Sequence, residues 1–221
     1  MIRAVLFDLD GTLINTWDLY VEAYLRTLES YYGRRLILSE LIALHPTSEL
    51  RFFGRALPGC DQAALCQQFL DHYRLLHPTH FGGLYTGVPE MLERLRARGF
   101  QLGLVTGKGR AAWEVTAGHV KLGGFDVIVT DEQVEAPKPD PEGLVKALDR
   151  LRARADEVIY VGDSRVDAEA AQRAGVRFAA ALWPKSPGEL GAFLSQVRAA
   201  GAWAELPTPP ALLVALDQDS A

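Results

Sequence analysis

Short, mostly apolar runs and longer helical patterns alternate along this chain of 221 residues. An uninterrupted apolar run is typical of a strand buried in a parallel sheet. Five such runs predict strands at Val5–Phe7, Gln101–Val105, Asp126–Val129, Val158–Val161 and Phe178–Leu182. Apolar residues at helical spacing separate the later runs and follow the last one. Strands alternating with helices predict an α/β fold, a Rossmann-like parallel five-stranded sheet flanked by helices.

Residues 16–83 have a different pattern, with helical periodicity and no convincing strand. After the first helical stretch, which begins near Trp17, three more are expected at about Leu36–Leu44, Leu50–Leu57 and Ala63–Leu76. Pro78 should end the last of them, because proline cannot continue a helix. The chain is therefore expected to hold two domains: an α/β core of residues 1–15 and 84–221, and a small inserted helical domain of residues 16–83.

The composition restricts the class of protein. A formal net charge of −5 argues against a nucleic-acid partner, because such proteins usually carry a basic patch. No apolar run is long enough to span a membrane, so no membrane partner is expected. Two cysteines offer no disulfide framework, and a reducing cytoplasm is the default location. The expected state is a monomer or a homodimer.

Two carboxylates follow the first predicted strand, in the stretch Asp8-Leu9-Asp10-Gly11-Thr12. Ligands of open α/β sheets bind at the carboxyl ends of the strands. The glycine lets the chain turn, so that both carboxylates can approach one centre. Two clustered carboxylates need a cation or a shared proton. The pattern therefore marks a candidate site, although an acidic turn of no function has a similar appearance.

Three further polar spots lie at the expected ends of later strands. At Thr106-Gly107, a hydroxyl would lie beside the N-terminus of the following helix. The free backbone N–H groups there favour an anion such as a phosphate oxygen. Lys138 stands between prolines on a stiff loop, in a chain that has few lysines. Asp163 and Asp167 follow the strand that ends at Val161. Each spot by itself also fits an ordinary turn or helix start.

Together, the four spots resemble the four signatures of the haloacid dehalogenase superfamily of phosphotransferases. The resemblance implies that Asp8 is the nucleophile and Asp10 the general acid/base. It implies that Thr106, Gly107 and Lys138 bind the phosphoryl group. A Mg²⁺ cofactor would be held by Asp8, Asp10 (through its backbone carbonyl), Asp163 and Asp167, with Asp167 acting directly or through water. Mg²⁺ prefers such oxygen ligands.

The resemblance also implies a function, that of a Mg²⁺-dependent phosphatase working through an aspartyl-phosphate. Its expected substrate is a small phosphorylated metabolite, phosphoglycolate or similar, because the overall likeness is to the phosphoglycolate phosphatase and pyrophosphatase-like group. The inserted helices would form a cap that selects the substrate. The candidates for that contact are His45, Arg51 and Arg55. The two arginines are favoured, since arginine binds carboxylate or phosphate through a planar fork.

Several alternatives stay open. They are a phosphomutase of the same superfamily, a pyrophosphatase and a non-catalytic ligand-binding relative, although the complete set of site residues argues against the last. A true dehalogenase is disfavoured, because those relatives lack the acid/base aspartate that Asp10 provides. A phosphonate-cleaving relative would need a lysine in the cap, and the segment 16–83 contains none.

Overall fold

The computed structural model describes residues 1–219 and divides the chain into two compact units. The first is formed by Met1–Asn15, Leu84–Thr106 and the described chain from Lys121 onward. The second is formed by Thr16–Gly83 and Gly107–Val120. We call them the α/β unit and the helical unit. Within residues 1–219, no helix is both long and apolar enough to cross a membrane.

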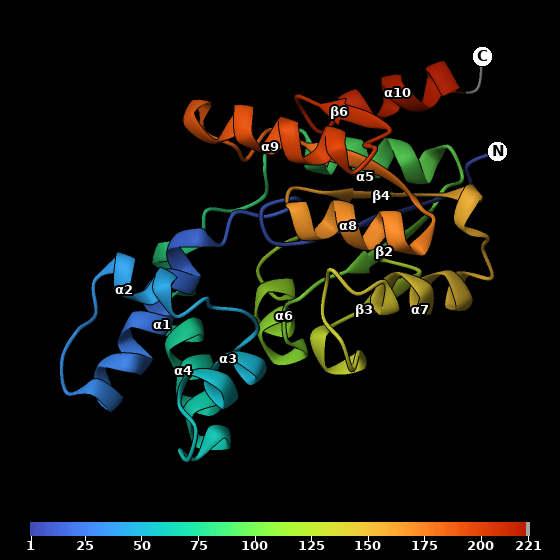
Figure 1. The fold of residues 1–221 in the computed structure, drawn as a ribbon. Helices are drawn as coiled ribbons and strands as arrows, with labels where there is room; N and C mark the ends of the chain where they lie inside the picture. Colours follow the sequence, from blue (N-terminus) through green and yellow to red (C-terminus); the bar gives the residue numbers. More distant parts are fainter. Residues whose placement is uncertain (220–221) are drawn as a thin grey trace. The chain divides into compact units, whose positions relative to one another are not determined.

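A parallel sheet of six strands forms the centre of the α/β unit, in the order β3-β2-β1-β4-β5-β6 (Figure 1). The strands are β1 (Ala4–Phe7), β2 (Gln101–Val105), β3 (Val127–Val129), β4 (Val158–Gly162), β5 (Arg177–Ala181) and β6 (Ala204–Leu206). The predicted parallel α/β fold is confirmed, but the predicted count of five strands is one too few. The missed strand, β6, is a three-residue edge strand with Glu205 in its middle, so it has no apolar run to reveal it.

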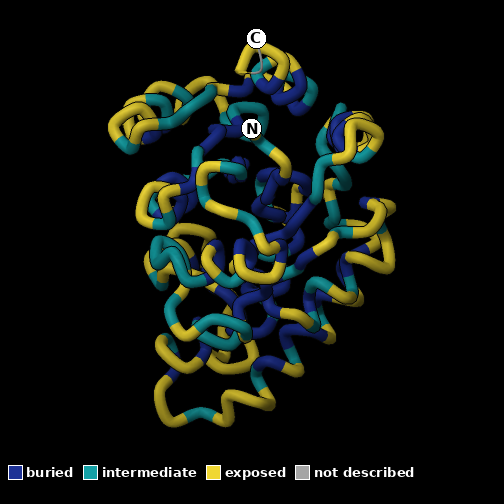
Figure 2. Tube along the Cα trace, turned by 90° about the vertical axis from the view of Figure 1, so that its right-hand side faces the viewer, coloured by how far each residue is buried: buried dark blue, intermediate teal, exposed yellow. Residues whose placement is uncertain are grey.

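Three helices cover one face of this sheet: α7 (Glu142–Leu151), α8 (Arg165–Ala174) and α9 (Pro187–Ala199). On α7 the buried side chains recur at helical spacing and pack on the sheet; they are Leu144, Ala147, Leu148 and Leu151. Buried and exposed segments alternate along the helices in Figure 2. Helix α5 (Val88–Ala97) contacts β2, and α10 (Ala211–Asp219) packs against α5. The chain crosses from β1 to β2 on one side of the sheet and later to β4 on the other. Because the crossovers are right-handed, α5 lies on the face opposite to α7, α8 and α9.

Strand β1 is the point at which the order of the sheet reverses. It pairs with β2 on one side and β4 on the other, so that Phe7 lies opposite both Leu104 and Val161. A crevice outside the carboxyl ends of the strands at such a switch point is where open α/β sheets bind ligands. The residues that follow β1, β2 and β4 therefore occupy the expected binding edge.

The helical unit contains α1 (Trp17–Tyr32), α2 (Leu38–Ala43), α3 (Glu49–Ala56), α4 (Gln62–His80) and α6 (Arg110–Ala117). Its core includes the aromatic rings of Tyr24, Phe52, Phe53 and Phe69, which contact one another. The expectation that Pro78 ends a helix is wrong, because α4 continues to His80. Proline fixes φ near the helical value, and in the last turn its missing N–H removes one hydrogen bond only.

A buried histidine lies in this core. The His77 ring stacks on the exposed His119 ring with centroids 4.1 Å apart, and it also contacts Phe81. Among residues 1–219, no hydrogen-bond partner reaches its buried Nε2 atom. Burial, together with the neighbouring His119 and Lys108, lowers the pKa of His77 to about 4. The folded protein therefore favours the neutral ring.

This arrangement predicts a pH-dependent stability. The contribution of the neutral His77 ring to the free energy of unfolding is fully present above pH 6.5. It is lost as the pH falls toward about 4, because His77 is protonated in the unfolded chain at a higher pH than in the folded protein. Solvent near the exposed His119 ring limits the expected loss to on the order of 1–2 kcal/mol. The His77→Phe variant should lose less stability than the wild type between pH 7 and about pH 4, measured by urea unfolding.

The control is His80→Phe, which changes a half-buried histidine on the same helix. It should keep the pH dependence of the wild type. Parallel stability curves for His77→Phe and the wild type would contradict the assignment.

Candidate active site

Asp8 follows directly on β1, at the switch point of the sheet. Its backbone N–H donates to the Val161 carbonyl at 2.9 Å, which continues the pairing with β4. Ala4 and Leu6 point into the core beneath α7 and α8, and side chains alternate along a strand. Asp8 continues this alternation, and its side chain is only 9% exposed. The sheet therefore delivers a buried carboxylate at its ligand-binding edge.

A tight turn carries the chain away from Asp8 and brings Asp10 onto the same edge. The N–H groups of Thr12, Leu13 and Ile14 all donate to the Leu9 carbonyl. Gly11 has a φ of 83°, and a Cβ atom there would lie 2.6 Å from Asp163 Oδ2. Only glycine fits this conformation and this close approach. The turn therefore packs directly against the carboxylate that follows β4.

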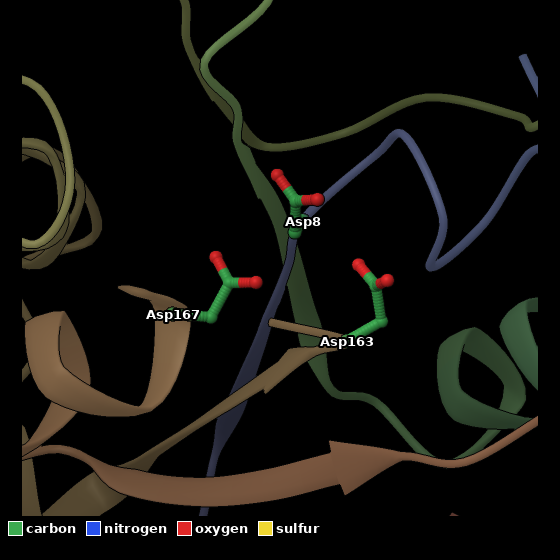
Figure 3. Close-up of side chains that lie close together, drawn as sticks. All are labelled: Asp8, Asp163 and Asp167. Atoms are coloured by element: carbon green, nitrogen blue, oxygen red, sulfur yellow. The ribbon is translucent and has the colours of Figure 1, made fainter. Parts of the chain in front are cut away.

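Three carboxylates converge at this edge (Figure 3). Each of Asp8, Asp163 and Asp167 offers one oxygen atom, and these atoms lie within 4.8 Å of one another. Asp163 follows β4, and Asp167 lies in the first turn of α8, where Ser164 caps the helix. At ~4 Å and an effective dielectric constant of ~20, two like charges repel by ~4 kcal/mol. The cluster therefore needs nearby cations or a bound proton.

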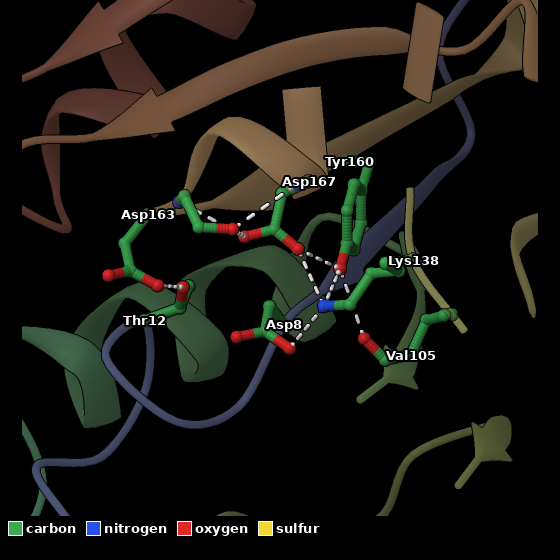
Figure 4. Close-up of polar contacts among 8 residues, drawn as sticks. Asp8, Thr12, Val105, Lys138, Tyr160, Asp163 and Asp167 are labelled. Carbon is green, nitrogen blue, oxygen red and sulfur yellow. Dashed lines mark hydrogen bonds and ion pairs between the residues drawn. The ribbon is translucent and has the colours of Figure 1, made fainter. Parts of the chain in front are cut away.

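Lys138 supplies one of these cations (Figure 4). Its Nζ atom lies 2.7 Å from Asp8 Oδ1 and 2.5 Å from Asp167 Oδ1. It also donates to the Tyr160 hydroxyl at 2.9 Å. That hydroxyl lies 3.0 Å from both Asp167 Oδ1 and the carbonyl oxygen of Val105. The ammonium group therefore bridges two carboxylates and donates a third hydrogen bond to a buried tyrosine.

The second oxygen of Asp167 is bound to the start of α8. It accepts hydrogen bonds from the Ser164 N–H at 3.1 Å and from the Ser164 hydroxyl. At Gly162, a Cβ atom would lie 2.6 Å from the Cβ of Asp167, so glycine permits this approach. Both oxygens of Asp167 thus have protein partners. This favours a role in holding Lys138 over direct metal ligation.

The pKa shifts follow from this arrangement. Burial raises the pKa of Asp8, and Lys138 opposes the shift only in part. Burial likewise raises the pKa of Asp163, against the opposing effect of Lys185. For Asp167, burial is outweighed by Lys138, which lowers its pKa. Burial would lower the pKa of Lys138, but Asp167 and Asp8 raise it well above the usual value. The ionised forms of Asp8 and Asp163 are therefore disfavoured unless a further positive charge lies nearby.

The residues of the site fit a divalent cation. Asp8 and Asp163 would supply two carboxylate oxygens, and the backbone carbonyl of Asp10 is a further candidate ligand. Carboxylate and carbonyl oxygens are the ligands that Mg²⁺ prefers. Because burial raises the pKa of both carboxyl groups, a cation at this position would stabilise their ionised forms.

The other predicted residues fall in different places. Thr106 is buried at the end of β2, and its N–H donates to the Val129 carbonyl at 3.0 Å. It thus lies on the same edge as Asp8. Gly107, Arg51 and Arg55 belong to the helical unit. Within that unit, Arg55 donates to the carbonyl oxygens of Leu44 and His45 after α2. The role of these three residues in binding a substrate stays a prediction.

Sequence reasoning missed residues that support the site. Tyr160 was included only in an apolar strand, although its phenol is the one polar group on the inward face of Val158–Val161. Lys185 follows β5, and its Nζ atom lies 2.7 Å from Asp163 Oδ2. The Thr12 hydroxyl donates to Asp163 Oδ1 at 3.3 Å. The scarcity of lysine in this chain was a signal that could have drawn attention to Lys185.

A family model for haloacid dehalogenase-like hydrolases matches residues 5–181. The chain therefore belongs to the haloacid dehalogenase-like hydrolase family. The predicted resemblance is confirmed, and so is the predicted enzyme class, a phosphoric-ester hydrolase.

Particular relatives refine the comparison. The chain is 36% identical over 186 residues to pyrophosphatase PpaX of Bacillus cereus, covering 82% of this chain and 84% of that protein. A candidate β-phosphoglucomutase from Thermotoga maritima superimposes with a TM-score of 0.74 and 27% identity, covering 98% of this chain and 99% of that one. A candidate phosphoglycolate phosphatase from Lactobacillus plantarum has a TM-score of 0.78 at 22% identity, covering 97% and 100%, and shares the fold.

The hydroxyl of Tyr160 gives a direct test of the site's construction. Tyr160→Phe should lower the free energy of unfolding by about 1–2 kcal/mol, because it removes a partner from Lys138, Asp167 and the Val105 carbonyl at a buried position. Urea unfolding would measure the loss. The matched control is Tyr32→Phe, at a side chain that is 41% exposed, where little change is expected. Equal stability of the two variants would refute a supporting role for Tyr160.

Proposed function

We propose that this protein is a Mg²⁺-dependent phosphatase that hydrolyses a small phosphorylated metabolite through an aspartyl-phosphate on Asp8. One observation carries the proposal: Asp8 lies at the switch point of the sheet, 2.7 Å from the Lys138 ammonium group and beside Asp163. A carboxylate nucleophile that must accept a doubly charged phosphoryl group needs positive charge beside it. Lys138 supplies one such charge, and a metal bound to Asp163 would supply another. Catalysis of phosphoryl transfer is mostly positioning and charge stabilisation.

In the first half-reaction, an Asp8 oxygen attacks phosphorus and the bond from phosphorus to the leaving oxygen breaks. Asp10 gives its proton to that oxygen, so the alcohol leaves neutral and the phosphoryl group stays on Asp8. Lys138 and Thr106 bind phosphoryl oxygens during the transfer. Asp167 and Tyr160 keep the Lys138 ammonium group beside Asp8.

In the second half-reaction, the Asp10 carboxylate takes a proton from water, and the water oxygen attacks phosphorus. The bond between phosphorus and Asp8 breaks, phosphate leaves, and Asp10 is again protonated. A bound Mg²⁺ would supply positive charge against the phosphoryl oxygens. Asp8, Asp163 and the Asp10 carbonyl would hold it, which leaves Asp167 with Lys138.

A pyrophosphatase is the second candidate, favoured by the 36% identity to pyrophosphatase PpaX. The two candidates share every residue of the mechanism and differ in the leaving group. An alkyl alkoxide is a strong base and needs a proton from Asp10. Phosphate is a much weaker base than an alkoxide and leaves readily as an anion. The dependence on Asp10 therefore differs between the two substrate classes.

The variants Asp8→Asn and Asp10→Asn test the two roles. In the presence of Mg²⁺, Asp8→Asn should form no phosphoenzyme and lose turnover of every substrate. Asp10→Asn should lose ~10²–10⁴-fold with phosphoglycolate, and much less with pyrophosphate. Steady-state rates and mass analysis of trapped phosphopeptides are the measurements.

The matched control is Asp149→Asn, an exposed carboxylate on α7, which should keep wild-type rates. A chelator added to the wild type should abolish turnover, and Mg²⁺ should restore it. A phosphoryl adduct on a residue other than Asp8 would sink the assignment of the nucleophile.

We further propose that the helical unit is a cap that selects the substrate, with Arg51 or Arg55 reading its non-reacting, anionic end. Arg55 donates to two carbonyl oxygens within its own unit, so its replacement would also disturb that unit. The α/β unit binds a phosphoryl group that all substrates share. Discrimination between substrates therefore needs residues outside that unit.

Arg51→Ala should lower kcat/KM for phosphoglycolate by about tenfold or more, the scale of one charge-assisted hydrogen bond. Turnover of an aryl phosphate, which has no anionic end, should change much less. Arg74→Ala, at an exposed arginine of α4, serves as the control and should leave both substrates unaffected. Proportionate losses for both substrates in Arg51→Ala would rule out a selective role.

A further inference from the structure

A second lysine, Lys185, contacts the carboxylate cluster at Asp163. The Nζ atom of Lys185 lies 2.7 Å from Asp163 Oδ2, with the lysine side chain 18% exposed and the aspartate side chain 14% exposed. The ammonium group also lies over the Phe193 ring of α9, 4.9 Å from its centroid. Neither the family signatures nor the mechanism uses this lysine. The pair therefore needs an explanation of its own.

The loop that carries Lys185 is fixed at several points. The N–H of Leu182 donates to the Leu206 carbonyl at 2.9 Å, and that of Lys185 to the Leu182 carbonyl at 3.1 Å. The Trp183 ring nitrogen donates to the Thr12 carbonyl at 3.0 Å, which links this loop to the turn after Asp8. Thr12 itself donates to Asp163. The loop thus places Lys185 beside Asp163 Oδ2, while Thr12 holds the other oxygen, Oδ1.

The charges of the cluster show what this contact does. Lys138 is shared by Asp8 and Asp167, so its single charge is committed to those two carboxylates. Asp163 is the third member of the cluster and pairs with Lys185. Two ammonium groups thus face three carboxylates. The oxygen that Lys185 contacts belongs to a carboxylate whose expected role is to bind a metal.

We propose that Lys185 is a positioning residue that holds the Asp163 carboxylate in the metal-free site and lowers the affinity of that site for a divalent cation. The inference rests on the proposed function, in which Asp163 is a metal ligand. A cation bound to Asp163 comes within a few ångströms of the ammonium group and is repelled by it. Metal binding then has to displace Lys185, which makes the site reversible and keeps it ordered when empty.

The test uses Mg²⁺ alone as the probe, titrated into metal-free protein by isothermal calorimetry. Lys185→Met should bind Mg²⁺ about tenfold or more tightly than the wild type, because a repelling charge is removed. Lys185→Arg keeps the charge and should stay within about threefold of the wild type. Lys146→Met removes a lysine that pairs with Glu142 on α7 and is the matched control, with unchanged affinity.

A second measurement separates positioning from general damage. In excess chelator, Lys185→Met should unfold at a lower temperature than the wild type, because Asp163 loses its partner. Saturating Mg²⁺ should close that gap, since the metal replaces the ammonium group and stabilises the folded state by mass action. A gap that persists at saturating Mg²⁺ would overturn the inference.

The outcomes also separate this inference from the proposed function. Equal or weaker Mg²⁺ binding by Lys185→Met, with binding by the wild type, would overturn the role of Lys185 and leave the metal site intact. Binding by Lys185→Met but not by the wild type would support the inference, because the lysine then blocks the site. Absence of binding by both proteins would overturn the metal site and the inference together. Unchanged binding by Asp163→Asn would show that Asp163 is no ligand, which overturns both as well.

Discussion

The buried repulsion among Asp8, Asp163 and Asp167 is the constraint on which the rest of the site depends. Their oxygens lie within 4.8 Å of one another, at a depth where water screens charge poorly. Each neighbouring feature relieves this repulsion. Lys138 bridges two of the carboxylates, Lys185 pairs with the third, and the start of α8 donates two hydrogen bonds to Asp167. In the proposed function, the excess negative charge of this cluster attracts a cation, and the cation and Lys138 together attract the phosphoryl group.

The sheet makes so dense a cluster possible. Because β1 pairs directly with β4 at the point where the strand order reverses, the carboxylates that follow these two strands meet without long loops. The approach still requires the absence of a side chain at two places. Gly11 leaves room for Asp163, and Gly162 leaves room for Asp167. Tyr160 adds a buried hydroxyl to an otherwise apolar strand, and this hydroxyl contacts Lys138, Asp167 and the Val105 carbonyl.

Much of this could be predicted from the sequence, because apolar runs mark buried strands and polar residues at their ends mark a binding edge. Asp8, Asp163 and Lys138 were found in this way. Strand β6 was missed because an edge strand of three residues has no distinctive pattern. The helix end predicted at Pro78 was wrong because a proline in the last turn costs too little to end a helix there. The contacts of Tyr160 and Lys185 join segments far apart in the chain, and no local pattern records them.

The two lysines divide the work of charge compensation unequally, and this difference has a physical basis. If Lys138 moved away, Asp8 and Asp167 would both lose their counter-charge at a buried position. Lys138 is therefore a fixed part of the site. Lys185 faces one carboxylate from a loop at the rim, and a cation that takes its place restores the balance. In the proposed mechanism, Lys138 is a permanent positive charge for the phosphoryl group, and Lys185 is exchanged for the metal. These residues would bind the group that all phosphate esters share, so we expect the helical unit to discriminate between substrates.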